Sequence, residues 1–319
     1  MSPGSNHSKS PSLDQWRLAA KRPALELRAV IIQRIRAFFS ERDYLEIETP
    51  CLIPAPAPET HIDAIASGKL FLQTSPELCM KRLLAAGYPR LFQICKCYRA
   101  GERGALHLPE FTMLEWYGSG MDYLDLMKDC EELIRFLSLA RNQDGAMEYR
   151  GERISLAPPW ERLPVADAFR RYASCSVEEA LEADSFDEIL VSEIEPNLGV
   201  PKPTFLCDYP ARLASLSRLK KDDPLVAERF ELYVARMEIA NGFSELTDER
   251  EQRERFRDDS EKRRSAGKVV YPPPERFLQS LANMPESAAG IALGIDRLVM
   301  LFLDKTDIRE VVAFTPEEL

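Results

Sequence analysis

The sequence predicts an α+β domain in which helices flank an antiparallel β-sheet. Residues alternate from Leu91 to Arg99 and again from Glu110 to Tyr117, and the ten residues between these segments suggest a long hairpin with a charged loop. Segments with helical spacing lie on either side of this pair. The chain has 319 residues, of which 45% are hydrophobic and 29% charged, which suits one large domain or two small ones.

An amphipathic helix is the first predicted element, since its apolar residues recur at helical spacing: Leu27, Val30, Ile31, Ile35, Phe38 and Phe39. A short strand follows, with residues 45, 47 and 49 on one face and glutamates on the other, and Pro50 ends it. Residues 1–12 are rich in Ser and Pro and contain no hydrophobic block. We therefore expect residues 1–24 to form a flexible tail and residues 25–319 to form the folded domain.

A proline-rich loop and a capped helix come next. The segment Pro54-Ala55-Pro56-Ala57-Pro58 predicts a stiff loop, and a strand is expected at Leu70–Gln73. An amphipathic run then predicts a helix with Ser75 as N-cap, Pro76 in the first position and Glu77 near the positive end of the dipole. Gly87 is expected to end this helix.

The second half of the chain is less regular. Residues from about 142 to 200 are weakly patterned and receive no assignment. The other expected elements are a helix from Asp122 to Leu139, strands Thr204–Tyr209 and Arg229–Glu238, a helix capped by Thr247 and reaching about Arg264, a strand Gly290–Leu293, and a helix that follows Gly294 and carries Asp296 and Arg297. The many charges of the helix after Thr247 are interpreted as a solvated face.

The composition argues against a nucleic-acid-binding or membrane protein. The net charge is −10, whereas proteins that grip many phosphates gather Lys and Arg. No apolar run approaches the roughly 20 residues that span a bilayer. Seven scattered Cys without a C-x-x-C pair suit reduced thiols, and three His offer few zinc ligands. We expect a cytoplasmic protein without membrane contact.

Three distant stretches carry residues suited to phosphate and metal chemistry. They are Tyr98-Arg99 with His107-Leu108-Pro109-Glu110-Phe111-Thr112, then Glu238-Ile239-Ala240-Asn241-Gly242-Phe243-Ser244-Glu245, then Gly294-Ile295-Asp296-Arg297. The fork of an arginine matches phosphate oxygens, and Mg²⁺ prefers carboxylate and phosphate oxygens. A single arginine more often forms a surface ion pair. Two arginines beside the specific eight-residue string favour a site that neutralises the phosphates of ATP.

Together these stretches resemble the catalytic core of class II lysyl-tRNA synthetases, from about Leu25 to Phe314. The resemblance implies a single catalytic domain of the class II type, a homodimer, and the use of ATP with Mg²⁺. It implies catalysis by Arg99 and Arg297 at the α- and γ-phosphates, and Mg²⁺ binding by Glu238 and Glu245. The nucleotide-binding positions that it implies are Arg99, Gly101, Glu102, His107, Leu108, Glu238, Ile239, Gly294 and Arg297.

Two positions depart from this family. Its second motif usually reads Arg-x-Glu, with the glutamate at adenine, but this chain has Arg99-Ala100-Gly101-Glu102. Either Glu102 reaches adenine through a rearranged turn, or Gly101 leaves that contact to the backbone. Leu108 also stands where an asparagine is usual.

A second group of residues outlines an amino-acid pocket. Phe111, Met113, Glu115 and Tyr117 share one strand face, where a buried carboxylate is costly unless it meets a cation. That cation is either a lysine-type ammonium of the substrate or an internal Arg or Lys. The resemblance implies substrate contacts from Ser75, Pro76, Glu77, Glu115, Tyr117, Asn241, Phe243 and Glu245.

Details of four segments resemble the stand-alone ligases of this family, which attach (R)-β-lysine to elongation factor P: Ser75, Trp116, Ala214-Ser215-Leu216 and Gly290-Ile291-Ala292-Leu293-Gly294. Lysyl-tRNA synthetases carry an anticodon-binding barrel ahead of the core, which here begins near Leu25. We therefore expect elongation factor P, and not tRNA, as the acceptor. Two alternatives stay open: an enzyme that activates α-lysine for tRNA or another acceptor, and a non-catalytic amino-acid sensor.

Overall fold

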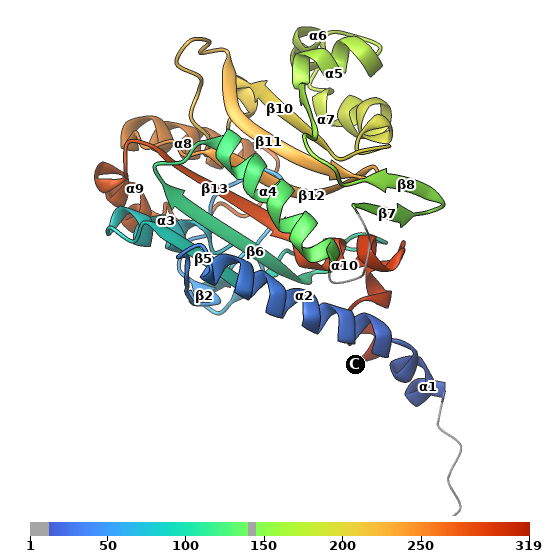
Figure 1. Ribbon diagram of the computed structural model, residues 1–319. Helices are drawn as coiled ribbons and strands as arrows, with labels where there is room; N and C mark the ends of the chain where they lie inside the picture. The colour runs from blue at the N-terminus through green and yellow to red at the C-terminus, as the bar shows by residue number, and fades with distance from the viewer. Residues whose placement is uncertain (1–12, 140–144) are drawn as a thin grey trace, which may run out of the picture.

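The computed structural model describes residues 13–139 and 145–319. Within these residues an eight-stranded sheet forms the centre (Figure 1). Its strands, in spatial order, are β1 (Leu45–Glu46), β5 (Arg90–Tyr98), β6 (Glu110–Ser119), β13 (Ala288–Gly294), β12 (Met237–Ser244), β11 (Val226–Val234), β10 (Thr204–Pro210) and β9 (Glu161–Pro164). The strands from β5 to β10 pair antiparallel, whereas β1 and β9 add parallel strands at the edges. The predicted α+β fold is confirmed, and the antiparallel pattern holds everywhere except at these edges.

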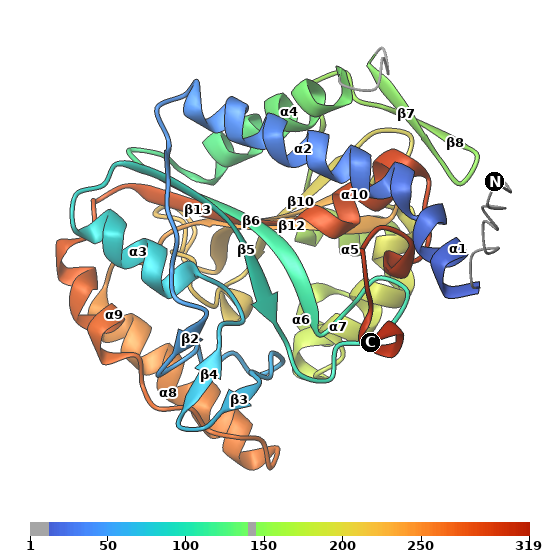
Figure 2. The same cartoon turned by 90° about the horizontal axis from the view of Figure 1, so that it is seen from below.

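Three helices cover one face of the sheet: α2 (Arg22–Ser40), α4 (Tyr123–Ser138) and α10 (Ile295–Leu303) (Figure 2). Aromatic packing joins α2 to the sheet, since the ring centroid of Phe39 lies 5.0 Å from that of Phe92 and 5.2 Å from that of Trp116. The predicted helices around Leu27–Phe39 and Asp122–Leu139 are confirmed. Asp122 caps α4 by accepting hydrogen bonds from the two N–H groups of Leu124 and Asp125.

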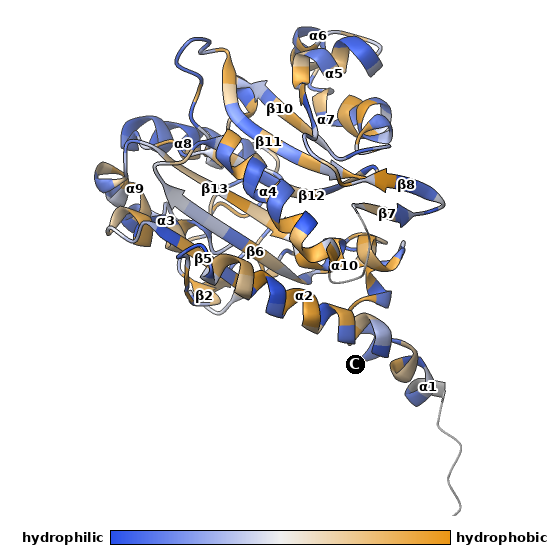
Figure 3. Cartoon of the chain, in the orientation of Figure 1, coloured by the Kyte–Doolittle hydropathy of each residue, from blue (hydrophilic) through white to orange (hydrophobic). Residues whose placement is uncertain are grey.

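The other face carries α3 (Glu77–Ala85), α8 (Glu249–Ser265), α9 (Glu275–Ser280) and a small sheet of β2 (Leu52–Ile53), β4 (Leu70–Leu72) and β3 (Ala66–Ser67) (Figure 2). Figure 3 shows α8 as largely hydrophilic, in line with its predicted solvated face. Two details of α8 differ from the prediction. Asp248, and not Thr247, accepts the cap hydrogen bonds, and Arg263 on this helix is fully buried.

The expected single strand Arg229–Glu238 is instead a hairpin of β11 and β12. Ala235 and Arg236 form its turn with φ angles of 51° and 66°, a left-handed pair typical of two-residue hairpin turns. Such turns usually contain Gly or Asn, and their absence here hid the turn from sequence analysis. The consequence is that Glu238 lies on β12 beside β11, and not at the end of β11.

The start of the chain differs from the expected tail. Residues Leu13–Ala20 form α1, and α2 begins at Arg22, so the part of residues 1–24 that is described is largely helical. Residues 1–12 lie outside the described residues, as do residues 140–144. None of the described helices is both long and apolar enough to cross a membrane.

The segment that sequence analysis left unassigned folds as short elements. A hairpin of β7 (Ala146–Tyr149) and β8 (Glu152–Ser155) is followed after β9 by α5 (Val165–Tyr172), α6 (Val177–Glu182) and α7 (Phe186–Ile189). These helices form an apolar cluster of their own that includes Leu206 and Tyr209 of β10. Elements of four to eight residues are too short to show a clear period, which explains the weak sequence signal.

Candidate active site

A cleft of about 580 Å³ lies on the face of the sheet opposite α2 and α4. Strands β6, β11, β12 and β13 contribute to its lining, together with α3, α8 and the loop between β5 and β6. Sequence-predicted residues from all three motifs meet here. One end of the cleft is lined by Arg99, His107 and Arg297, which we call the cationic end. Glu77 and Glu115 line the other end, and together with the buried Glu245 they form what we call the carboxylate pocket.

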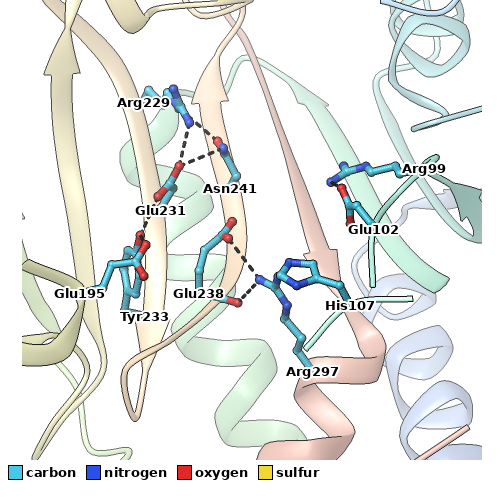
Figure 4. Close-up of polar contacts among 10 residues, drawn as sticks. All are labelled: Arg99, Glu102, His107, Glu195, Arg229, Glu231, Tyr233, Glu238, Asn241 and Arg297. Carbon is cyan, nitrogen blue, oxygen red and sulfur yellow. Dashed lines mark hydrogen bonds and ion pairs between the residues drawn. The ribbon is translucent and has the colours of Figure 1, made fainter. Parts of the chain in front are cut away.

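At the cationic end, Arg297 on α10 connects two of the motifs (Figure 4). Its Nη1 donates to the main-chain oxygen of Glu238 at 2.7 Å and to Glu238 Oε2 at 3.1 Å, while Nη2 lies 2.7 Å from His107 Nε2. A guanidinium can only donate, so His107 accepts through Nε2 and is neutral with its proton on Nδ1. Burial and the charge of Arg297 lower the pKa of His107, which agrees with this assignment.

Arg99 follows β5, and part of its guanidinium has no hydrogen-bond partner among the described residues. Its guanidinium lies 5.1 Å from the ring centroid of Phe111, its Nη1 is 3.5 Å from Glu102 Oε1, and its buried Nε has no hydrogen-bond partner among the described residues. An unsatisfied buried cationic donor is costly and suits an anionic ligand. Glu102 here turns back towards Arg99, across a turn in which Gly101 has a φ of 79°. Leu108 is buried in the main core.

A β-bulge in β12 brings its site residues onto one face. The register with β11 shifts by one residue between Leu232 and Tyr233, which leaves Ile239 as the extra residue. The bulge reverses the alternation of side chains, so that Glu238 faces the cleft together with Asn241 and Phe243. Glu238 and Glu245 lie near opposite ends of this strand, roughly 20 Å apart at about 3.3 Å per residue. A single Mg²⁺ therefore cannot be bound by both carboxylates at once.

Glu231 on β11 is a site residue that sequence reasoning missed. Its Oε1 accepts from Arg229 Nη2 at 2.7 Å and its Oε2 accepts from the Tyr233 hydroxyl at 2.8 Å (Figure 4). Burial raises the pKa of Glu231, and repulsion from Glu238 on the neighbouring strand adds to the rise. The sequence feature that could have identified Glu231 is its place between apolar residues of a strand, Phe230-Glu231-Leu232, since a buried glutamate usually has a specific partner.

In the carboxylate pocket, Glu115 is held by two hydroxyl groups. Ser75 Oγ donates to Oε1 at 2.6 Å and Tyr117 donates to Oε2 at 2.7 Å. Ser75 Oγ also accepts the N–H of Glu77 at 3.0 Å, so one residue orients both the first turn of α3 and the buried acid. Burial, with repulsion from Glu77, raises the pKa of Glu115 to about 8.

Lys81 on α3 is the second residue that the sequence reading missed. Its Nζ lies 2.5 Å from Glu77 Oε1 and 2.5 Å from Glu245 Oε2, and 4.7 Å from the ring centroid of Phe243. An internal cation is thus present for Glu77 and Glu245, whereas the hydrogen-bond partners of Glu115 within the described part of the chain are two hydroxyl groups. Burial nevertheless raises the pKa of Glu245 to about 8, and its Oε1 has no hydrogen-bond partner among the described residues.

A glycine on β13 leaves room for two groups of the pocket to approach each other. A Cβ atom on Gly290 would lie 2.1 Å from the ring of Tyr117 and 2.8 Å from Glu245 Oε1. No side chain fits there, so Gly290 allows these two groups to approach each other. Pro76 sits at the start of α3, and Gly294 precedes the first turn of α10 and lines the cleft.

Comparison with known proteins gives the family. The family model for class II tRNA synthetases (D, K and N) matches residues 7–318. An elongation factor P–(R)-β-lysine ligase from Pseudoalteromonas translucida is 39% identical over 318 residues, covering 95% of this chain and 98% of that protein. A ligase of the same name from Salmonella gallinarum is 38% identical over 317 residues, covering 94% and 97%.

The fold and the site therefore define a class II synthetase-type ligase. Within that class, the chain belongs to the family of elongation factor P–(R)-β-lysine ligases. The family resemblance predicted from the three motifs is confirmed.

The pH dependence of stability tests the carboxylate pocket. A glutamate has an ordinary pKa near 4.5, whereas the folded pKa is about 8 for Glu115 and for Glu245. Between these values the folded state binds more protons than the unfolded state, so the free energy of unfolding falls as pH rises towards and through 8. Glu115→Gln, which mimics the protonated acid, should flatten the decline in Tm between about pH 5 and pH 9. The control variant Glu110→Gln, whose side chain is exposed, should keep the decline in Tm of the unmodified protein. If Tm declined as much in Glu115→Gln as in the unmodified protein, the pKa assignment of Glu115 would be contradicted.

Proposed function

We propose that this ligase activates (R)-β-lysine with ATP to form an acyl-adenylate and transfers the acyl group to a lysine side-chain amino group of elongation factor P. The observation that carries the proposal is the division of one cleft into a cationic end and a carboxylate pocket. The names of the similar ligases supply the two substrates.

The charge balance of the carboxylate pocket suits a diamine. Three glutamates, Glu77, Glu115 and Glu245, face one ammonium group, that of Lys81. If all three were ionised, the pocket would carry a net charge of −2, since three negative charges meet one positive charge. Buried charges of this kind are stable only when they are paired. A substrate with two ammonium groups supplies the two positive charges that balance the pocket. A substrate with one ammonium group would leave one acid protonated.

The cationic end suits the triphosphate. Activation requires a carboxylate to attack the α-phosphorus of ATP, and both reactants are negative. Arg99 offers a buried donor without a partner, and Arg297 lies beside neutral His107. In this proposal the two arginines neutralise phosphate oxygens and hold the reactants in line. Gly101, Glu102, Leu108, Ile239 and Gly294 remain the positions proposed to surround the nucleotide.

Glu231 and Glu238 are the residues that would hold Mg²⁺. They lie on neighbouring strands, and the negative charge of Glu238 helps to raise the pKa of Glu231. Mg²⁺ is commonly bound through one or two carboxylates together with substrate phosphates. A bound ion would supply positive charge that relieves this repulsion and offsets that of the phosphates.

The arginine assignment predicts a specific loss of activation. Arg99→Ala and Arg297→Ala should each reduce (R)-β-lysine-dependent ATP–pyrophosphate exchange by more than about 100-fold, because each removes a donor to developing charge. Arg103→Ala is the matched control, since its side chain is 60% exposed in the same loop. Circular dichroism should stay unchanged in all three variants. Normal exchange in either of the first two would exclude that arginine from phosphate binding.

The acceptor and the substrate isomer can be tested together by intact-mass spectrometry. Elongation factor P would be incubated with the enzyme, ATP, Mg²⁺ and (R)-β-lysine, with α-lysine in a parallel reaction. We expect one added lysyl mass that accumulates much faster with the β isomer. No addition with either isomer would refute the proposed function, and faster addition with α-lysine would refute the substrate assignment.

We also infer a homodimer that forms through the edge of the sheet at β1. Three exposed apolar residues occupy this region: Val30 on α2 (41% exposed), Leu45 on β1 (50%) and Leu52 on β2 (45%). An edge strand with apolar side chains is a natural site for pairing. Light scattering should give twice the mass of the chain, and Leu45→Glu should shift it towards the monomer. A monomeric unmodified protein at micromolar concentration would contradict this inference.

A further inference from the structure

The loop that carries Glu59 has no role in the function described so far. Glu59 is half-buried and lines the cleft, directly after the proline-rich segment that ends at Pro58. We propose that Glu59 is the general base that takes a proton from the attacking amino group of elongation factor P in the transfer step. This inference rests on the proposed function and adds a catalytic residue to it.

Glu59 lines the same cleft as Glu77 and Arg99, and the charges of both act on its carboxylate. The charged groups that act on its carboxylate are Glu77 of α3, Arg99 after β5, Arg229 of β11 and Asp259 of α8. Glu77 belongs to the carboxylate pocket and Arg99 to the cationic end. The acyl carbon of an aminoacyl-adenylate joins the amino acid to the phosphate, so it must lie between these two ends. An incoming amine must reach the same place.

Glu59 is also the glutamate of this cleft that is free to take a proton. The other glutamates lining it each have an ion-pair or hydrogen-bond partner: Glu77 with Lys81, Glu102 with Arg99, Glu115 with Tyr117, Glu231 with Arg229, and Glu238 with Arg297. The buried Glu245 behind Glu77 is paired with Lys81 as well. Among the described residues, none donates a hydrogen bond to the Glu59 carboxylate. Burial and the nearby charge of Glu77 raise the pKa of Glu59 to about 7, which suits a base that works near neutral pH.

A buried arginine fixes the position of the Glu59 loop. Arg263 Nη1 donates to the main-chain oxygens of Glu59 at 2.7 Å and Ile62 at 3.0 Å, and its Nη2 donates to Asp63 Oδ1 at 2.7 Å. The main-chain oxygen of Asp63 accepts the N–H of Ala100 at 2.6 Å, which links the loop to the residue after Arg99. Pro58 restricts the backbone just before Glu59. The base is thus held relative to the phosphate-binding arginine, as a catalytic group must be.

The transfer step explains why a base is needed. A free lysine has a pKa near 10.4, so only about one in 2,500 is neutral at pH 7. The acceptor nitrogen forms a bond to the acyl carbon, the bond from that carbon to the phosphate oxygen breaks, and AMP leaves with the electron pair. The acceptor changes from ammonium to amide and loses two protons. Glu59 takes the proton that blocks the lone pair, and the second passes to water after the C–N bond forms.

Two other titratable groups near this position are less suited. His61 lies two residues further along the loop and lines the cleft, but its side chain is exposed. Asp258 lines the wall formed by α8 and is 69% exposed beside Arg257. Glu59, in contrast, is half-buried and lies within the influence of both Glu77 and Arg99.

The test separates activation from transfer in the variant Glu59→Gln. Pyrophosphate exchange should remain within about twofold of the unmodified enzyme, which also shows that the variant is folded. Single-turnover transfer from preformed adenylate to elongation factor P should fall by at least about 100-fold. The inflection near pH 7 in the wild-type transfer rate should disappear. Hydroxylamine, whose amino group is neutral at pH 7, should capture the adenylate equally fast in both enzymes.

Asp258→Asn is the matched control and should transfer at the wild-type rate. Unchanged transfer in Glu59→Gln would overturn the inference, as would an equal loss with hydroxylamine. A raised KM for (R)-β-lysine with a normal transfer rate would also overturn it, because Glu59 would then be a binding residue. Loss of the inflection in His61→Gln instead would assign the base to His61. Failure of the unmodified enzyme to form adenylate would refute the proposed function itself, a result distinguishable from all of these.

Discussion

The contact of Lys81 with Glu77 and Glu245 is the interaction on which the rest of the site depends. One buried ammonium lies 2.5 Å from an oxygen of each acid, and Glu115 beside them is left to hydroxyl groups. Without Lys81, three acids would share a pocket with no internal cation, which the fold could tolerate only by protonating them. With Lys81 present, two of the acids are paired, but one positive charge does not balance three carboxylates. The pocket therefore favours a cationic substrate.

The sheet keeps this pocket apart from the cationic end. Strand β12 runs through both, with Glu238 near Arg297 at one end and Glu245 near Lys81 at the other. The bulge at Ile239 lets both ends of the strand face the same cleft. In the proposed function, a substrate that lies along β12 would meet acids at its amino groups and arginines at its reacting carboxylate, and that arrangement would orient it for attack on ATP.

Much of this architecture could be predicted from the sequence, because the spacing of apolar residues and the local composition determine where its helices and strands lie. The hairpin whose first strand leads into Arg99, the helix after Gly294 and the acid at Glu115 each follow a clear local pattern. Lys81 and Glu231 were missed for a physical reason: a charge in a helix or strand is expected on the surface, and only tertiary packing shows that these two are buried. The turn at Ala235-Arg236 lacks the Gly or Asn that usually marks a left-handed turn, so one continuous strand was predicted across it.

The most direct test of the charge balance is proton release when (R)-β-lysine binds. Titration calorimetry at pH 7 in buffers of different ionisation enthalpy measures it. The free enzyme should hold Glu115 and Glu245 largely protonated, because the pKa of each is about 8. Two substrate ammonium groups should favour the carboxylates and release about one to two protons. Binding without proton release would contradict the claim that an uncompensated carboxylate pocket recognises the substrate.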